Sequence, residues 1–494
     1  MSSSKSSPKP GGKSSFKPIP PFALFYQLTY MSAMAAAGIS RSKVFELAAR
    51  STSPAASYFE AINTLVEEMR FDYPEACRKI GNQAKSENMR SFLLRLSDAL
   101  RSGEPLAEFL SREAEVQSDD YKNKYERDLE SLKQWSNAFS SIAISVALIV
   151  IIQMISSMIY SMDVSVMGGL VMTGIAMSGF GAWIIQRSAP REIMTLPPMK
   201  GSVEQRRVMR MFRIILPIGL SVTVVLYLLG LDFGIILIGL ASFLLPVGIL
   251  SMRADKTILK KDEEFSTFLR STGGMASASG TTLKEALTKI DLSSFPHLQP
   301  DINRLSMRLQ ALVSPEICWH KFGLESGSKL MSEVVDIFYG AVKIGGDPER
   351  VGYLCSLFAA RTAQLRAKRR LVAGTFSSLT SVMQAVVAGL MVFVLSIISN
   401  FAAIVPTLMP KNTDALKGQN ISLGMAQFSA ADLQFLTIVT VAMVIIMAIV
   451  SAAAIIFCDG GSKLKVTLYL ALTLFISGLS YIFVPPMVSG ILKM

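Results

Sequence analysis

Long apolar stretches without a single ionisable residue recur along the chain, separated by polar segments. Each stretch can supply the ~20 residues that a helix needs to cross the hydrocarbon core of a bilayer. The pattern therefore predicts seven membrane-spanning helices, in an all-α polytopic membrane protein. The charge-free stretches are 134–162, 164–186, 214–231, 233–252, 371–410, 433–458 and 466–492. A hydrophobic content of 51% and a mean hydropathy of +0.42 agree with this prediction, because both exceed what an ordinary soluble protein of this length shows.

Two polar regions that lie outside these spans share a local pattern of glycine, acid and proline. The first reads DALRSGEPLAEFL from residue 98, and the second reads AVKIGGDPERVGYL from residue 341. Gly103 and Gly346 can adopt the left-handed conformation that ends a helix. An acid and a proline then suit the first turn of the next helix, where the acid can cap it. The pairs are Glu104 with Pro105 and Asp347 with Pro348. Each stretch is therefore predicted to be a corner between two helices.

The spacing of earlier glycines indicates that the two regions are copies of one module. Gly38 precedes Gly103 by 65 positions, and Gly280 precedes Gly346 by 66, each after a helix that begins with Phe. We therefore expect two homologous helical modules that alternate with the spans. The predicted order is a disordered basic tail 1–21, the first module 22–133, four spans 134–252, the second module 253–370, and three spans 371–494.

The charges of the short loops predict the orientation in the membrane. The 187–213 connection is strongly basic, whereas the turns at Asp163 and Asp232 contain no basic residue. Basic short loops stay in the cytoplasm. The N-terminus and both modules are therefore predicted to be cytoplasmic, with the C-terminus and the 406–432 loop outside. That loop carries a candidate glycosylation acceptor, Asn420, in the triplet Asn420-Ile421-Ser422.

Residues that would carry chemistry are scarce. With four cysteines and two histidines in the chain, no spacing favours a metal site over structural roles, and no catalytic or cofactor-binding motif is present. The predicted spans hold no ionisable group at mid-membrane, which disfavours a transporter, although a carrier of an uncharged substrate is an open alternative. Small residues in the second span favour close helix packing instead. They are Gly168, Gly169, Gly174, Gly179 and Gly181.

Two modules with a Phe-led helix, a glycine after a small-residue run and a G-[DE]-P corner, each followed by membrane helices, resemble the type II secretion F domain. Asp262-Glu263-Glu264-Phe265 and Phe268-Leu269-Arg270 resemble the opening of the second module in archaeal members. The family supplies platform proteins of type IV pilus-like machines. The resemblance implies a non-enzymatic platform, first of an archaellum and alternatively of an adhesion or DNA-exchange pilus. Its implied partners are a hexameric cytoplasmic secretion ATPase, pilin or archaellin subunits and a second copy of the chain, with no directly bound nucleic acid.

Basic residues near the span ends form a candidate surface for the ATPase. Complementary charge would favour an acidic partner, whereas anionic lipid headgroups are the competing explanation. For the cluster before the fifth span, docking and lipid anchoring are equally favoured. The candidate residues are Arg206, Arg207, Arg210, Lys256, Lys260, Lys261, Arg361, Arg366, Lys368, Arg369 and Arg370.

Overall fold

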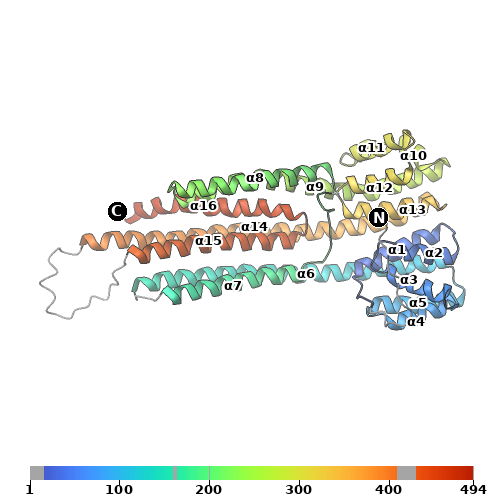
Figure 1. The fold of residues 1–494 in the computed structure, drawn as a ribbon, viewed down its shortest axis with the longest axis horizontal. Helices are drawn as coiled ribbons and strands as arrows, with labels where there is room; N and C mark the ends of the chain where they lie inside the picture. Colours follow the sequence, from blue (N-terminus) through green and yellow to red (C-terminus); the bar gives the residue numbers. More distant parts are fainter. Residues whose placement is uncertain (1–15, 160–163, 200, 409–429, 493–494) are drawn as a thin grey trace, which may run out of the picture. The chain divides into compact units, whose positions relative to one another are not determined.

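The computed structural model describes residues 16–159, 164–199, 201–408 and 430–492, which are helical throughout apart from short connections and one isolated bridge (Figure 1). The chain forms two compact units. Unit 1 contains Met1–Lys124, Asp262–Gly323 and Met331–Thr362, and unit 2 contains Tyr125–Lys261, Leu324–Leu330 and Ala363–Met494. The predicted glycosylation acceptor Asn420 and most of the tail 1–21 lie outside the described residues.

Two runs of six consecutive helices, which we call the first and the second succession, make up most of unit 1. In each, the sixth helix continues into an apolar stretch. The first succession is α1 (Pro21–Ala36), α2 (Arg41–Ala49), α3 (Ala56–Glu67), α4 (Tyr73–Gln83), α5 (Glu87–Ser102) and α6 (Leu106–Ile159). The second is α9 (Phe233–Ser279), α10 (Leu283–Lys289), α11 (Gln299–Gln310), α12 (Pro315–Glu325), α13 (Lys329–Lys343) and α14 (Pro348–Leu408), with a short 3-10 turn η1 (Leu292–Ser294) after α10.

Each succession has an apolar core built from aromatic side chains. In the first, Phe45, Phe59 and Phe92 are fully buried and belong to one cluster of side chains from α1 to α6. In the second, Trp319 packs edge-on against Phe322 and Phe338, with ring centroids 5.9 and 5.6 Å apart. Burial of one such side chain stabilises a fold by roughly 1.5–3 kcal/mol.

The glycines of the corners separate into two kinds. Gly38, Gly103 and Gly280 have φ values of +72°, +78° and +57°, a region in which glycine is favoured. The prediction for Gly346 is wrong, because the left-handed residue at that corner is its neighbour Gly345, with φ of +99°. Gly346 is needed for space instead, since a Cβ atom there would lie 2.8 Å from the carbonyl oxygen of Ala341.

The acids of the two corners have different roles. The Asp347 carboxylate caps α14, accepting hydrogen bonds from the N–H of Arg350 at 3.1 Å and from the hydroxyl of Ser277 at 3.0 Å. Glu104 pairs instead with the side chain of Arg112 in α6. Asp347 is exposed, and the small loss of hydration at its carboxyl acts to raise the pKa, but these hydrogen bonds outweigh it and hold the pKa below its ordinary value.

Removal of the Asp347 cap is expected to lower the free energy of unfolding by about 1 kcal/mol in Asp347→Ala. The pKa of this carboxyl is lower in the folded state, so its stabilisation is present above the unfolded pKa of about 4 and is lost as pH falls through the folded pKa. Thermal unfolding in detergent at pH 7 and at low pH measures both effects. Glu104→Ala is the control, because it breaks only a partly exposed ion pair with Arg112 and should lower the free energy of unfolding by about 0.5 kcal/mol or less; equal losses in the two variants would contradict the capping role.

Six helices in the described part of the chain are long and apolar enough to cross a membrane, compared with seven predicted spans. They are Leu106–Ser156, Val203–Leu228, Phe233–Ser279, Pro348–Ala403, Leu433–Asp459 and Lys463–Ile491. The remaining predicted span, 164–186, coincides with α7 (Val164–Ser188), which is not among the six. The other helices of unit 2 are α8 (Val203–Leu228), α15 (Ala430–Asp459) and α16 (Val466–Leu492), which follows a 3-10 turn η3 (Lys463–Lys465).

Glycine allows close approach of the helices at only some of the predicted positions. In α7, a Cβ atom on Gly174 would lie 2.8 Å from Val146, and one on Gly181 would lie 2.9 Å from Phe139, both in α6. Gly168, Gly169 and Gly179 have open space around them. The tightest approach in the spans is at Gly248 of α9, where a Cβ atom would lie 2.5 Å from the Cα atom of Leu468 in α16.

All four cysteines are buried as free thiols. For Cys77 in α4, burial raises the pKa to about 12. Since the thiolate is the reactive form, a thiol with such a pKa is unreactive at neutral pH. The cysteines therefore act as small apolar side chains.

Candidate functional site

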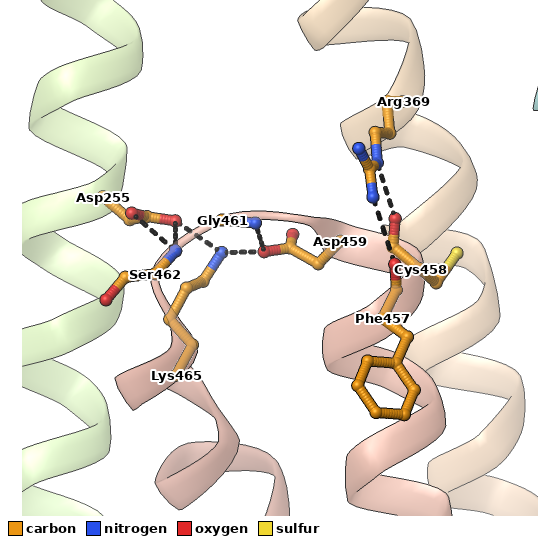
Figure 2. A network of polar contacts seen from close by, with 8 residues as sticks. All are labelled: Asp255, Arg369, Phe457, Cys458, Asp459, Gly461, Ser462 and Lys465. Carbon is orange, nitrogen blue, oxygen red and sulfur yellow. Dashed lines mark hydrogen bonds and ion pairs between the residues drawn. The ribbon is translucent and has the colours of Figure 1, made fainter. Parts of the chain in front are cut away.

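A buried polar network lies where α15 ends and α16 begins (Figure 2). The Nζ atom of Lys465 is 3.0 Å from Oδ2 of Asp255 and 2.5 Å from Oδ2 of Asp459. The three side chains are only 2, 5 and 7% exposed, in the order Lys465, Asp255, Asp459. One buried cation therefore serves two buried carboxylates, which come from α9 and from the last residue of α15.

Backbone N–H groups of the α15–α16 turn donate further hydrogen bonds to both carboxylates. The N–H of Ser462 donates to Asp255 at 3.3 Å, and the N–H of Gly461 donates to Asp459 at 3.3 Å. Charge-assisted bonds of this kind are stronger than neutral ones. The turn is consequently held against α9 by side-chain and main-chain contacts together.

Arg369 of α14 closes the C-terminal end of α15 (Figure 2). Its guanidinium donates to the carbonyl oxygens of Cys458 at 2.9 Å and Phe457 at 3.1 Å, and to that of Pro190 at 2.9 Å. Carbonyl groups in the last turn of a helix have no partner within the helix, so an arginine that supplies donors satisfies them. Gly460 follows with φ of +71°, which favours glycine, and a Cβ atom there would lie 2.2 Å from the guanidinium carbon and would displace Arg369.

One turn earlier in α14, Arg366 forms a second buried ion pair. Its Nε and Nη2 atoms lie 2.8 and 2.7 Å from Oε1 of Glu192, and the two side chains are 1 and 4% exposed. Glu192 belongs to the segment that follows α7. This segment is fixed further by the bridge between Thr195 and Ser328 and by the N–H of Leu196, which donates to the carbonyl of Gly327 at 3.0 Å.

Together these contacts link five parts of unit 2 at the ends of its apolar helices: α9, α14, the end of α15, the turn with η3 before α16, and the segment after α7. Breaking a buried pair by removing one partner costs about 3–5 kcal/mol, because the other charge stays buried. The cavity that borders Asp255 and Ser462 has a volume of about 10 Å³, which is room for a single water molecule and not for a substrate. No cluster of three or more metal-ligating side chains occurs among the residues that were described. The network therefore holds the ends of the helices together, and we call it the polar joint of unit 2.

The predicted basic residues fall into three groups. Exposed side chains are those of Arg206, Arg207, Arg210, Lys256 and Lys260. Exposed or half-buried residues near the start of the α14 span are Arg361, Lys368 and Arg370; Arg361 pairs with Asp119 and Lys368 with Glu126. Buried side chains are those of Lys261, Arg366 and Arg369. The last group is not available to an external partner, because the structure uses Arg366 and Arg369 to hold unit 2 together.

The fold and the network define a class of protein: a multi-pass helical membrane protein in which two groups of six helices are joined to apolar spans, with buried polar contacts at the ends of the spans. Residues 28–154 match the family described as Type II secretion system (T2SS), protein F. This match confirms the resemblance to the F-domain family, and it covers most of the first succession of helices and the apolar part of α6.

Two curated proteins from archaea are similar to the chain. Flagella accessory protein J of Methanocaldococcus jannaschii is 27% identical over 318 residues, and the protein of the same name from Methanococcus voltae is 23% identical over 318 residues. In both cases the matched part is 62% of this chain and 57% of the relative, so the chain matches little more than half the length of these relatives. No solved structure matches the chain.

Proposed function

We propose that this protein is the membrane platform of an archaeal type IV pilus-like filament, with the archaellum as its machine. The observation that carries the proposal is the F-domain match over residues 28–154, together with the similarity to two proteins named flagella accessory protein J. That name favours the archaellum over an adhesion or DNA-exchange pilus. The platform would couple a cytoplasmic secretion ATPase to the insertion or rotation of pilin-like subunits.

Three long helices supply a route for mechanical coupling. α6, α9 and α14 contain 54, 47 and 61 residues, and each joins a helical module to an apolar span without a break. At 1.5 Å per residue, α14 alone is about 90 Å long. A helix of this kind transmits a push or a rotation along its axis. The joint formed by Arg366, Arg369 and the Asp255–Lys465–Asp459 network would then pass the movement to the neighbouring spans.

The exposed basic residues support docking of an acidic partner on the cytoplasmic side. The proposed docking set is Arg206, Arg207, Arg210, Lys256 and Lys260, all exposed. Association between complementary charges is fast and salt-sensitive. Anionic lipid is the competing ligand for the same side chains.

Reversal of the docking set to glutamate is expected to abolish or strongly weaken binding of the ATPase. The measurement is a pull-down of the purified ATPase by the full chain in nanodiscs of neutral lipid, which removes the lipid contribution. Arg41→Glu with Lys289→Glu is the control, since both side chains are exposed and basic but lie outside the docking set. ATPase binding that is unchanged by the reversal would assign the docking set to lipid.

We also propose that the chain itself has no catalytic activity and that the ATPase supplies the energy. The purified chain is then expected to hydrolyse no ATP, and robust turnover that survives removal of contaminating ATPases would contradict the platform function.

A further inference from the structure

The corner between α11 and α12 places four large apolar side chains in solvent. Met307, Leu312, Val313 and Ile317 are 60, 83, 40 and 49% exposed. We call these four residues the α11–α12 apolar patch. All four belong to unit 1, in one stretch of eleven residues. Grouped apolar exposure outside membrane spans marks a contact surface, whereas single exposed apolar residues carry no such meaning.

Leu312 is an unfavourable residue for its backbone position. Its φ is +58°, and it is one of two non-glycine residues with positive φ in the described chain. The N–H of Val313 donates to the carbonyl of Arg308 at 3.2 Å, which closes α11 in the manner that favours glycine or asparagine at the left-handed position. Folding alone therefore does not account for leucine here, since its side chain contributes little to the core.

The first succession of helices supplies an internal comparison. Its left-handed residue at the matching corner, between α3 and α4, is Arg70, with φ of +57°. A similar run follows each corner, Pro74-Glu75-Ala76-Cys77 in the first and Pro315-Glu316-Ile317-Cys318 in the second. The residue with left-handed backbone geometry is thus arginine in the first copy and leucine in the second.

At the Arg70 corner Met69 is 50% exposed, whereas the apolar groups that follow are covered. Phe71 is half-buried, with the ammonium of Lys79 4.3 Å from its ring centroid, and Ala76 is fully buried. The corresponding residues of the second copy, Val313 and Ile317, are exposed. The first copy therefore exposes one large apolar side chain at this corner, Met69, whereas the second copy exposes four.

The stretch that carries the α11–α12 apolar patch has more basic than acidic residues, with Arg308 and Lys321 against Glu316. Lys343 lies beside it, with its Nζ atom 2.6 Å from Glu316. Arg308 lies one residue after Met307, and Lys321 lies one turn after Ile317 in α12. A partner that covers the patch would therefore gain from carboxylates around an apolar side chain.

We infer that the α11–α12 apolar patch docks an apolar side chain of the secretion ATPase, framed there by acidic residues. The inference rests on the proposed function and adds a second, apolar contact to the basic docking set. Self-association through this surface is disfavoured, because two copies would bring two basic rims together. An apolar anchor within a charged rim is the arrangement that dominates binding energy in many interfaces.

Leu312→Asn and Leu312→Gly test the inference without damage to the fold, because both residues accept the left-handed conformation. We expect an unchanged or higher thermal midpoint and a loss of about tenfold or more in affinity for the purified ATPase, as for a central anchor. The full chain in neutral-lipid nanodiscs is titrated with the ATPase. The matched control is Met69→Asn, at a side chain 50% exposed at the corner of the first copy, with affinity unchanged.

The outcomes separate the inference from the proposed function. Wild-type affinity in Leu312→Asn, with binding lost on reversal of the basic docking set, would overturn the inference and leave the platform function in place. Absence of ATPase binding by the unmodified chain would contradict the proposed function itself. If Leu312→Asn keeps ATPase affinity but loses binding to phosphatidylglycerol vesicles, the patch is a membrane contact and the inference is wrong.

Discussion

Replacement of Lys465 by methionine is expected to lower the free energy of unfolding by about 3–5 kcal/mol. The ammonium group is the cation between Asp255 and Asp459, and its loss leaves two carboxylates buried side by side. Thermal unfolding of the purified protein in detergent measures the change as a lower midpoint. Weaker membrane accumulation in cells should accompany it.

The control for Lys465 lies in the same 3-10 turn. Lys463 is exposed, so Lys463→Met should change stability little. The triple variant Lys465→Met, Asp255→Asn and Asp459→Asn removes all three charges and is expected to recover much of the loss, as buried ion pairs replaced together often do. Equal midpoints for Lys465→Met and Lys463→Met would contradict the joint described for unit 2.

Gly248→Ala is expected to destabilise the packing of α9 against α16 by about 1–3 kcal/mol. The new Cβ atom would lie 2.5 Å from the Cα atom of Leu468, and a backbone atom cannot rotate away as a side chain can. Separation of the two helices would also disturb the contact between Asp255 and Lys465 further along α9. The thermal midpoint in detergent is again the measurement.

Gly389→Ala in α14 is the matched control for Gly248→Ala. No atom lies within 4 Å of a Cβ built there, so the substitution should be neutral or stabilising by up to ~1 kcal/mol. If Gly248→Ala were as stable as Gly389→Ala, the close approach of α9 and α16 would be wrong.

The positions of the spans were largely predictable from the lengths of the apolar stretches. A helix that crosses a bilayer needs about 20 consecutive apolar residues, and the sequence shows such stretches directly. The charge-free stretch 371–410 lies in α14 as far as Leu408, where the helix ends, and 233–252 falls within α9. What composition did not predict was continuity: α14 begins at Pro348 and α9 continues to Ser279, far beyond the apolar stretches.

Backbone geometry at the corners was only partly predictable. The corners at Gly38, Gly103 and Gly280 each contain a single glycine, and in each case this glycine has positive φ. At the fourth corner two glycines are adjacent, and sequence alone does not decide between them. The structure assigns positive φ to Gly345 and the crowded position to Gly346, next to the carbonyl of Ala341.

The buried network was missed for a physical reason. Asp255 and Ser462 are 207 positions apart, and Arg366 and Glu192 are 174 apart, so no local pattern joins them. Basic residues beside a span are also what lipid contact predicts, and sequence does not distinguish an inward face of α14 from an outward one. A usable signal was present in the isolated acids next to span ends, namely Asp255 and Asp459.

The account rests on both helical modules being exposed in the cytoplasm, where an ATPase reaches them. Ser102→Cys and Glu349→Cys introduce one exposed thiol in each module, against a background of four buried native thiols. Leu229→Cys, in the turn between α8 and α9, marks the predicted outer face and is 69% exposed. One sample of intact cells and one sample of lysed cells are each treated with a membrane-impermeant maleimide. The account predicts labelling at 229 in intact cells and at 102 and 349 only after lysis; labelling of either 102 or 349 in intact cells would contradict it.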